Sequence, residues 1–230
     1  MARTRSATYD QQRDEMLARA AELFAATGYA GTSMNEVARA CGVTKPALYH
    51  YFRDKDALLA AIAQNHVDHL EEIVLEVQAL GLPPTAHLRE LILRFVRDYA
   101  HSQHEHRVLT QDVKFLPTRE RQRVLDGERR VVAAFADAIA AVRPEVEKAS
   151  LDKPLTMLLF GMMNWLFTWL RPDGPLTHEA MSEVVADLFF GGLPAVRAGV
   201  HSPPAARRAR AVAAGSRRAT PISTTEGDNP

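Results

Sequence analysis

The chain has 230 residues, of which 28 are lysine or arginine and 28 are aspartate or glutamate. Because these charges cancel, any affinity for nucleic acid must come from a local basic patch rather than from the whole surface. The single cysteine excludes an intramolecular disulfide framework and fits a reducing cytoplasm. No signal peptide is visible, and the longest apolar run, residues 155–170, contains Asn164 and is short for a membrane span. We therefore expect a cytoplasmic protein without a membrane anchor.

The first part of the chain predicts an amphipathic helix behind a short flexible segment. Residues 1–8 are small, polar and basic, and we expect them to stay mobile until DNA is bound. A helix is predicted from about Tyr9 to Thr27, where Gly28 provides the C-terminal cap. Its apolar stripe consists of Met16, Leu17, Ala20, Leu23 and Phe24. This helix is expected to pack on the segment that follows.

Residues 32–55 carry the signals of two short helices joined by a tight turn. Ser33 is a favourable N-cap, and Glu36 three residues later completes a capping box. Gly42 then interrupts the helix, because glycine adopts a left-handed conformation at little cost and lets the chain turn sharply.

Thr44 is a second N-cap, and Pro46 lies in the first turn of the next helix, where its missing N–H does no harm. That helix is predicted from Lys45 to about Tyr51, with Leu48 facing inward. A helix, a glycine turn and a short second helix form the helix-turn-helix arrangement, whose second helix enters the major groove of DNA. The alternative is a capped helical hairpin with no role in DNA binding.

The remaining patterns of period 3.6 predict further helices. They are expected over residues 54–79, 85–101, 105–115, 118–142, 152–170 and 177–191. With the three N-terminal helices they make about nine, and alternating strand patterns are few, so we predict an all-α fold. The helix of residues 54–79 has no internal glycine or proline and would transmit movement rigidly. Residues 201–230 lack an apolar face and are expected to form a disordered basic tail.

Residues 20–62 resemble, without a gap, the N-terminal domain of TetR/AcrR-family transcriptional regulators. The resemblance rests on Gly28-Tyr29, Val37-Ala38, Gly42-Val43, Leu48-Tyr49, Tyr51-Phe52 and Lys55. It implies a homodimeric, ligand-controlled repressor that binds a palindromic DNA operator. The DNA-binding domain would cover residues 9–55, with the motif at 33–52, and an all-helical ligand-binding and dimerisation domain would cover residues 56–200. The helices near residues 155–170 and 177–191 are the candidates for the dimer interface.

The motif offers distinct side chains to DNA. Lys45 can reach a guanine edge, whereas the hydroxyls of Tyr49 and Tyr51 suit phosphates. Lys55 lies near the start of the long helix, where the dipole also favours a phosphate. Ala47 can touch a thymine methyl but cannot donate a hydrogen bond. By position, the resemblance implies DNA contacts at Asn35, Thr44, Lys45, Ala47, Tyr49, His50, Tyr51 and Lys55, to which we add Ser33, the cap of the first motif helix.

Two segments of the C-terminal half, residues 106–117 and 160–172, look like a TetR subgroup whose effectors are acyl-CoA thioesters. This resemblance implies a repressor of fatty-acid, aromatic-acid or sterol-side-chain breakdown. Aromatic residues suit an acyl group, and arginines such as Arg171 or Arg119 suit phosphates. The predicted effector-binding residues are Phe115, Phe160, Asn164, Trp165, Trp169 and Arg171. The alternatives are that these residues pack in the core or the dimer interface, and that the effector is a hydrophobic, drug-like compound as in repressors of efflux pumps.

Other chemistries find little support in the residues. The chain has no glycine-rich phosphate loop, nucleophile elbow or HExxH helix, so we expect neither an enzyme nor a bound cofactor. The spacing of His101, His104 and His106 does not place all three on one helical face, and no cysteine lies near, so no metal site is predicted. The alternative of another class is a helical, architectural DNA-binding protein without a ligand, and activation rather than repression is also open.

Overall fold

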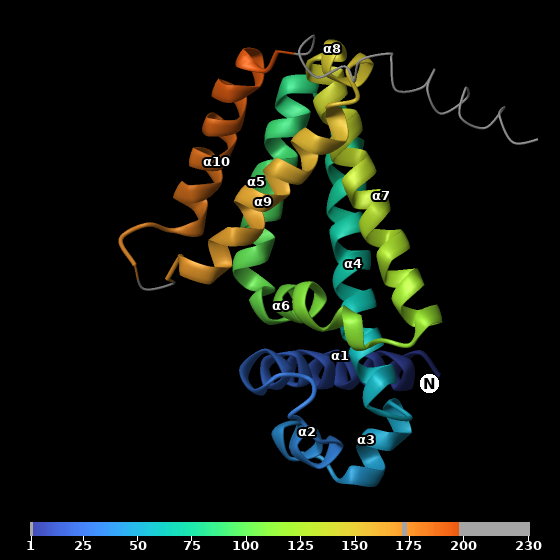
Figure 1. The fold of residues 1–230 in the computed structure, drawn as a ribbon. Coiled ribbons are helices and arrows are strands. Elements are labelled where there is room, and N and C mark those ends of the chain that lie inside the picture. The colour runs from blue at the N-terminus through green and yellow to red at the C-terminus, as the bar shows by residue number, and fades with distance from the viewer. Residues whose placement is uncertain (1, 172–173, 198–230) are drawn as a thin grey trace, which may run out of the picture. The chain divides into compact units, whose positions relative to one another are not determined.

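The structure, a computed structural model, describes residues 2–171 and 174–197. Within these ranges it contains ten α-helices and two short 3₁₀-helices and no strand (Figure 1). This confirms the all-α prediction, with one helix more than the nine expected. None of the described helices is both long enough and apolar enough to cross a membrane. The predicted tail, residues 201–230, lies outside the described residues.

Three helices form the N-terminal part of the molecule, called the head below: α1 (Ala2–Thr27), α2 (Met34–Ala40) and α3 (Lys45–Tyr51). α1 begins at Ala2 rather than near Tyr9, so residues 2–8, which were expected to be flexible, continue this helix. The other two helices have the predicted bounds. Their apolar positions pack against α1, as the amphipathic stripe of residues 16–24 requires.

The ends of α2 and α3 follow the predicted local chemistry. The Ser33 side chain accepts a hydrogen bond from the Glu36 N–H at 3.3 Å, and the Glu36 carboxylate accepts one from the Ser33 N–H at 2.7 Å. Gly42 has a φ of +67°, the left-handed conformation that the turn between the helices needs. Thr44 caps α3 by accepting a hydrogen bond from the Ala47 N–H at 3.4 Å. Both caps and the turn are therefore determined by residues within the motif.

The remaining helices form the body of the molecule. The long ones are α4 (Lys55–Ala79), α5 (Pro84–His101), α6 (Gln103–Asp112), α7 (Thr118–Val142), α9 (Asp152–Trp169) and α10 (His178–Gly192). The segment predicted as one helix over residues 105–115 is α-helical only to Asp112 and then tightens into the 3₁₀-helix η1 (Val113–Phe115). The short α8 (Pro144–Lys148) was not predicted, because five residues hold too few apolar positions to show a helical period.

The buried apolar residues form two hydrophobic clusters. The division between them does not coincide with the domain boundary predicted near residue 55. One cluster lies among α4, α5, α7, α9 and α10. The other joins the head to the first half of α4 and to later segments of the body, through Val108, Leu109, Val113, Leu116 and Val124. The helix α6 therefore packs with the head, although the chain reaches it only after two helices of the body.

A glycine allows the close approach of α4 and α7. A Cβ atom placed on Gly127 would lie 2.3 Å from Val67 Cγ1 and 3.0 Å from the Glu71 carboxylate. Val67 is fully buried, so it has no space to retreat into. The absence of a side chain at position 127 is therefore a condition for the packing of these two helices.

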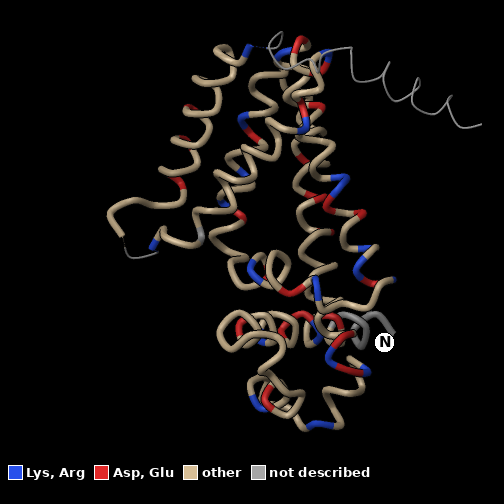
Figure 2. The backbone as a smooth tube through the Cα atoms, in the orientation of Figure 1, with Lys and Arg blue, Asp and Glu red and all other residues tan. Residues whose placement is uncertain are grey.

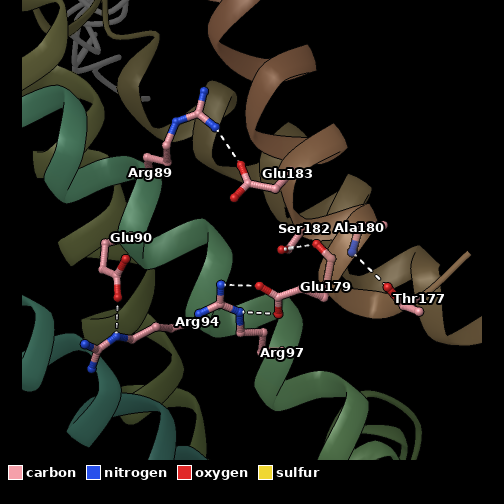
Figure 3. A network of polar contacts seen from close by, with 9 residues as sticks. All are labelled: Arg89, Glu90, Arg94, Arg97, Thr177, Glu179, Ala180, Ser182 and Glu183. Atoms are coloured by element: carbon pink, nitrogen blue, oxygen red, sulfur yellow. Dashed lines mark hydrogen bonds and ion pairs between the residues drawn. The ribbon is translucent and has the colours of Figure 1, made fainter.

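Ion pairs connect α5 to α10, as Figure 3 shows. Arg89 donates hydrogen bonds to Glu183 at 2.9 Å and to Asp187 at 2.6 Å. Arg97 holds Glu179 through two parallel hydrogen bonds. Each exposed pair contributes little to stability by itself, about 0–1 kcal/mol. They add to the apolar packing of Val185, Ala186 and Phe189, which buries one face of α10 in the core.

Candidate functional site

The second motif helix, α3, presents a polar and aromatic surface. Leu48 is fully buried and fixes the helix on the head, whereas Lys45, Tyr49 and His50 are exposed. The Lys45 ammonium lies 5.9 Å from the centre of the Tyr49 ring. Ala47 is half-buried, so its methyl group offers only a small contact surface. A helix with a buried anchor and exposed donors on the opposite side can bind in a groove of DNA.

Tyr51 is placed by α1 rather than by α3 alone. Its ring stacks on Tyr9 with 4.5 Å between the ring centres, and its hydroxyl donates a hydrogen bond to the Gln12 side chain at 2.7 Å. His50 meets both tyrosine rings edge-on. The sequence did not single out Tyr9, because an aromatic residue near the start of a polar helix carries no periodic signal. In the structure it joins the aromatic cluster beside α3.

Lys55 has a structural role that the sequence did not reveal. Its ammonium donates hydrogen bonds to the carbonyl oxygens of Tyr29 and Thr32, both at 2.9 Å, and lies 4.3 Å from the centre of the Tyr29 ring. Tyr29 in turn donates to Asp56, and burial followed by this hydrogen bond raises the pKa of its hydroxyl. Lys55 thus connects the loop before α2 to the start of α4. These two bonds use two of the three N–H groups of the ammonium.

The other predicted DNA contacts lie at the beginnings of the two motif helices. Ser33 and Thr44 use their side-chain oxygens as caps, and both residues are exposed. Asn35 is exposed in the first turn of α2. Helix beginnings expose N–H groups that attract phosphates, so this position suits residues that orient a protein on DNA.

A cavity of about 140 Å³, called the effector cavity below, lies among α4, α5, α6, α7 and α9. Most of its wall is apolar, and its polar groups come from Thr110, Glu128 and Asn164 together with the rings of Tyr99 and His106. Burial raises the pKa of the Glu128 carboxyl above its usual range. The amide oxygen of Asn164 is buried and has no hydrogen-bond partner among the described residues. An apolar space with a few polar groups is the usual form of a small-molecule site.

The structure brings only two of the predicted effector-binding residues to this cavity. Phe160 and Asn164 line it. Trp165 and Trp169 point away, with 67% and 48% of their surfaces exposed. The reason is the helical period: residues four apart share a face, whereas residue 165 is turned by about 100° from residue 164.

The last two predicted residues lie elsewhere. Phe115 stacks on Tyr29 with 5.5 Å between the ring centres, which places it against the head. Arg171 is exposed just after the end of α9. Neither lines the effector cavity. Phe115 ends η1, which directs it toward the head, and Arg171 follows the end of α9.

Two histidines from different helices meet beside the cavity. His66 Nε2 on α4 lies 3.2 Å from His106 Nδ1 on α6, and the Tyr99 ring stacks on His106 with 3.9 Å between ring centres. Burial lowers the pKa of His66 to about 3 and that of His106 to about 4, so both rings are neutral at pH 7. The described residues contain no group of three or more metal-ligating side chains that could hold a metal ion.

Comparison with known proteins assigns the fold to a family. Residues 16–62 match the family described as "Bacterial regulatory proteins, tetR family", and residues 81–193 match "Tetracyclin repressor-like, C-terminal domain". A solved TetR-family transcriptional regulator from Bordetella parapertussis 12822 shares 34% identity, with a TM-score of 0.75 over 80% of this chain and 97% of that one. The chain belongs to the TetR family. The predicted resemblance is therefore confirmed, and its relatives are transcriptional regulators.

The relatives of this TetR-family chain include both transcriptional activators and transcriptional repressors. The transcriptional activator FasR of Mycolicibacterium smegmatis is 26% identical over 80% of this chain and 84% of its own length. The transcriptional repressor KstR2 of Rhodococcus jostii is 25% identical over 79% of this chain and 91% of its own. AibR has been solved in complex with isovaleryl coenzyme A and operator DNA. Its chain is 27% identical to this one, with a TM-score of 0.68 over 77% of this chain and 97% of that one.

Proposed function

We propose that this TetR-family chain is a homodimeric transcriptional repressor that leaves its operator when a short-chain acyl-CoA thioester enters the effector cavity. The observation that carries the proposal is the position of α6. His106 and Thr110 of this helix line the cavity, whereas Val108 belongs to the hydrophobic cluster of the head. A ligand that fits the cavity best after α6 has shifted would favour a different position of the head.

The operator would be read by two copies of α3. The exposed side chains of Lys45, Tyr49 and His50 support base and phosphate contacts in the major groove. In a twofold dimer the two recognition helices would enter successive major grooves, about 34 Å apart. A palindromic operator follows from that symmetry.

The dimer would form through α9 and α10. Large apolar side chains are exposed along both helices, and Leu158, Trp165 and Leu188 each have about two thirds of their surfaces open to solvent. Such a row of aromatic and aliphatic groups is typical of a protein interface. The ion pairs of Arg89 and Arg97 already hold α10 on α5, so the surface would need little rearrangement to bind a second copy.

The size and chemistry of the cavity support a small acyl group. At about 140 Å³ it is smaller than the ~300–1,000 Å³ typical of sites for drug-sized ligands. The unpartnered amide oxygen of Asn164 would accept a hydrogen bond from an amide N–H of the thioester's pantetheine arm, since the acyl group itself has no donor. No arginine or lysine lines the cavity, so the phosphates of a thioester would have to lie outside it. A drug-sized effector, as in efflux repressors, would need a larger cavity.

The test measures release of a labelled operator by fluorescence anisotropy. Acyl-CoA esters of increasing chain length are compared with free CoA and with the free acids. We expect release by esters of a few carbons and none by the acids. The variant Asn164→Leu should lose the response while still binding the operator, whereas Thr168→Ala, an exposed position one turn further along α9, should keep it. Release by none of the esters would refute the assignment of the effector class.

A further inference from the structure

A second pocket lies where the head meets the body, and the repressor function proposed above does not use it. This junction pocket has a volume of about 350 Å³ and is formed by α1, the loop between α3 and α4, the first half of α4 and the start of α7. Its volume falls within the range of small-molecule sites, ~300–1,000 Å³. The effector cavity lies further along α4 and is lined by different residues, so the two spaces are separate sites.

The charge of the junction pocket is positive. Three arginines line it, Arg13, Arg53 and Arg123, against one carboxylate, that of Glu120. Figure 2 shows basic and acidic segments alternating at the end of α7 nearest the head. Three positive groups and one negative group leave a net charge of +2, which favours a doubly charged anion. Arginine binds phosphate oxygens through two parallel hydrogen bonds, so converging arginines suit a phosphoryl group in particular.

The three arginines differ in how far protein groups engage them, and Arg13 also lies over the Phe52 ring, 5.8 Å from its centre. Arg123 makes no hydrogen bond or ion pair with the described residues. Arg53 lies 3.1 Å from its neighbour Asp54 and 4.0 Å from Glu120, while Arg13 lies 3.5 Å from Asp14. Exposed pairs of this kind contribute about 0–1 kcal/mol, which a bidentate contact to a phosphate can exceed.

The rest of the lining indicates what accompanies the phosphate. Ala57, Ala60 and Ala61 share one face of α4 and give the pocket an apolar wall, against which a ring could pack. The Gln64 side chain donates to Asp68 at 2.6 Å, while its own oxygen is buried without a hydrogen-bond partner among the described residues. A ligand hydroxyl or amino group that reached Gln64 would supply the missing donor.

We propose that the junction pocket binds a nucleotide-like phosphate ester, with the phosphate on the arginines, a ring on the alanine wall and a donor on Gln64. The ligand would touch Arg53, which precedes α4 directly after the recognition helix, and Arg123, which belongs to the body. Occupancy would therefore favour one arrangement of head and body and change operator affinity. The phosphate could belong to a free nucleotide or to the nucleotide end of a larger molecule, and the probes below separate these sources.

The test is calorimetric titration of the full chain, without DNA, with pyrophosphate, adenosine 3′,5′-bisphosphate and CoA. We expect the bisphosphate to bind more tightly than pyrophosphate, because only it meets the alanine wall and Gln64. If CoA binds as tightly as the bisphosphate, the natural ligand is the nucleotide end of a larger molecule. If CoA binds clearly more weakly, the natural ligand is a free nucleotide. Arg123→Ala should lower the affinity for the bisphosphate by about tenfold or more, and Arg123→Lys should retain part of the affinity that alanine loses.

The matched control is Arg129→Ala on the same helix, whose side chain pairs with Asp126 on an exposed face outside the pocket. It should leave the affinity for the bisphosphate within about twofold of the wild type. Equal losses in both variants would mean non-specific attraction and would overturn the site. So would failure of both phosphate probes to bind, or equal binding of malonate, a dianion without phosphoryl oxygens.

The linkage to DNA is measured separately, as the shift in operator affinity that the bisphosphate causes. The shift should appear in the wild type and in Asn164→Leu, whose effector cavity has lost its amide group, and should vanish in Arg123→Ala. Loss of operator affinity in Arg123→Ala without any ligand would instead make this arginine a DNA contact and overturn the proposal. Because the cavity variant keeps the junction pocket, failure of the effector hypothesis and failure of this one give different results.

Discussion

Replacing Gly127 by alanine tests the packing on which the position of α7 against α4 depends. Two effects oppose each other. Alanine favours a helix by about 1 kcal/mol over glycine, whereas forcing a methyl group into a filled core costs about 1–3 kcal/mol. Because the new Cβ would lie 2.3 Å from Val67 Cγ1, and that side chain is fully buried, the strain should exceed the gain. We expect the free energy of unfolding to fall by about 1 kcal/mol.

The second variant, Val67→Ala, removes the group that collides with the new methyl. Alone it should cost about 2 kcal/mol, through lost burial and the cavity that it leaves. In the double variant the methyl group introduced at position 127 has space, so the total loss should be smaller than the sum of the single losses by at least about 1 kcal/mol. This coupling is the quantity that distinguishes a close contact from independent effects at the two positions.

The assay is urea unfolding, followed by circular dichroism at one fixed protein concentration, because a dimer's stability depends on concentration. Ala133→Gly, at an exposed position of the same helix, measures the helix-propensity difference in this context. Additive losses in the double variant, or a single Gly127→Ala variant more stable than the wild type by the full propensity difference, would refute the close contact with Val67.

Three further predictions concern the head and the buried histidines. Lys55→Met removes two hydrogen bonds to backbone carbonyls and should lower the free energy of unfolding by about 1–3 kcal/mol, seen in urea unfolding; no loss would mean that water replaces the ammonium. Tyr51→Phe removes the hydrogen bond to Gln12 and should cost about 0.5–1.5 kcal/mol, and a Gln12→Ala background should abolish that cost. The lowered pKa values of His66 and His106 mean that the unfolded chain binds more protons below pH 6.5. Stability should therefore be fully present above pH 6.5 and decline as the pH falls toward 4, and the double variant His66→Leu, His106→Phe should show a flatter decline in acid unfolding curves.

Local chemistry explains why the helix-turn-helix could be predicted from the sequence. The caps at Ser33 and Thr44, the left-handed turn at Gly42 and the bounds of both motif helices depend on residues within a few positions of each other. The resemblance to a family added the expected roles of individual residues. It did not show that Lys55 donates to carbonyls of a loop more than twenty residues earlier, because no local pattern encodes such a contact.

The effector cavity could be predicted only in part. Apolar richness in residues 155–170 pointed to a helix of which two predicted residues, Phe160 and Asn164, line the cavity. It did not separate them from Trp165 and Trp169, because a helix that is apolar on several sides does not reveal which side faces inward. Only the positions of the neighbouring helices decide that question.

The sequence by itself determined the family, the all-α class, the bounds of most helices and the motif that reads DNA, since these follow from local caps, turns and helical periods. The tertiary structure decided which faces of those helices meet. It placed His106 against His66, turned Phe115 toward the head, and brought Arg13, Arg53 and Arg123 from three separate segments to one pocket. Such sites depend on contacts between residues far apart in the chain, and a linear pattern does not specify those contacts.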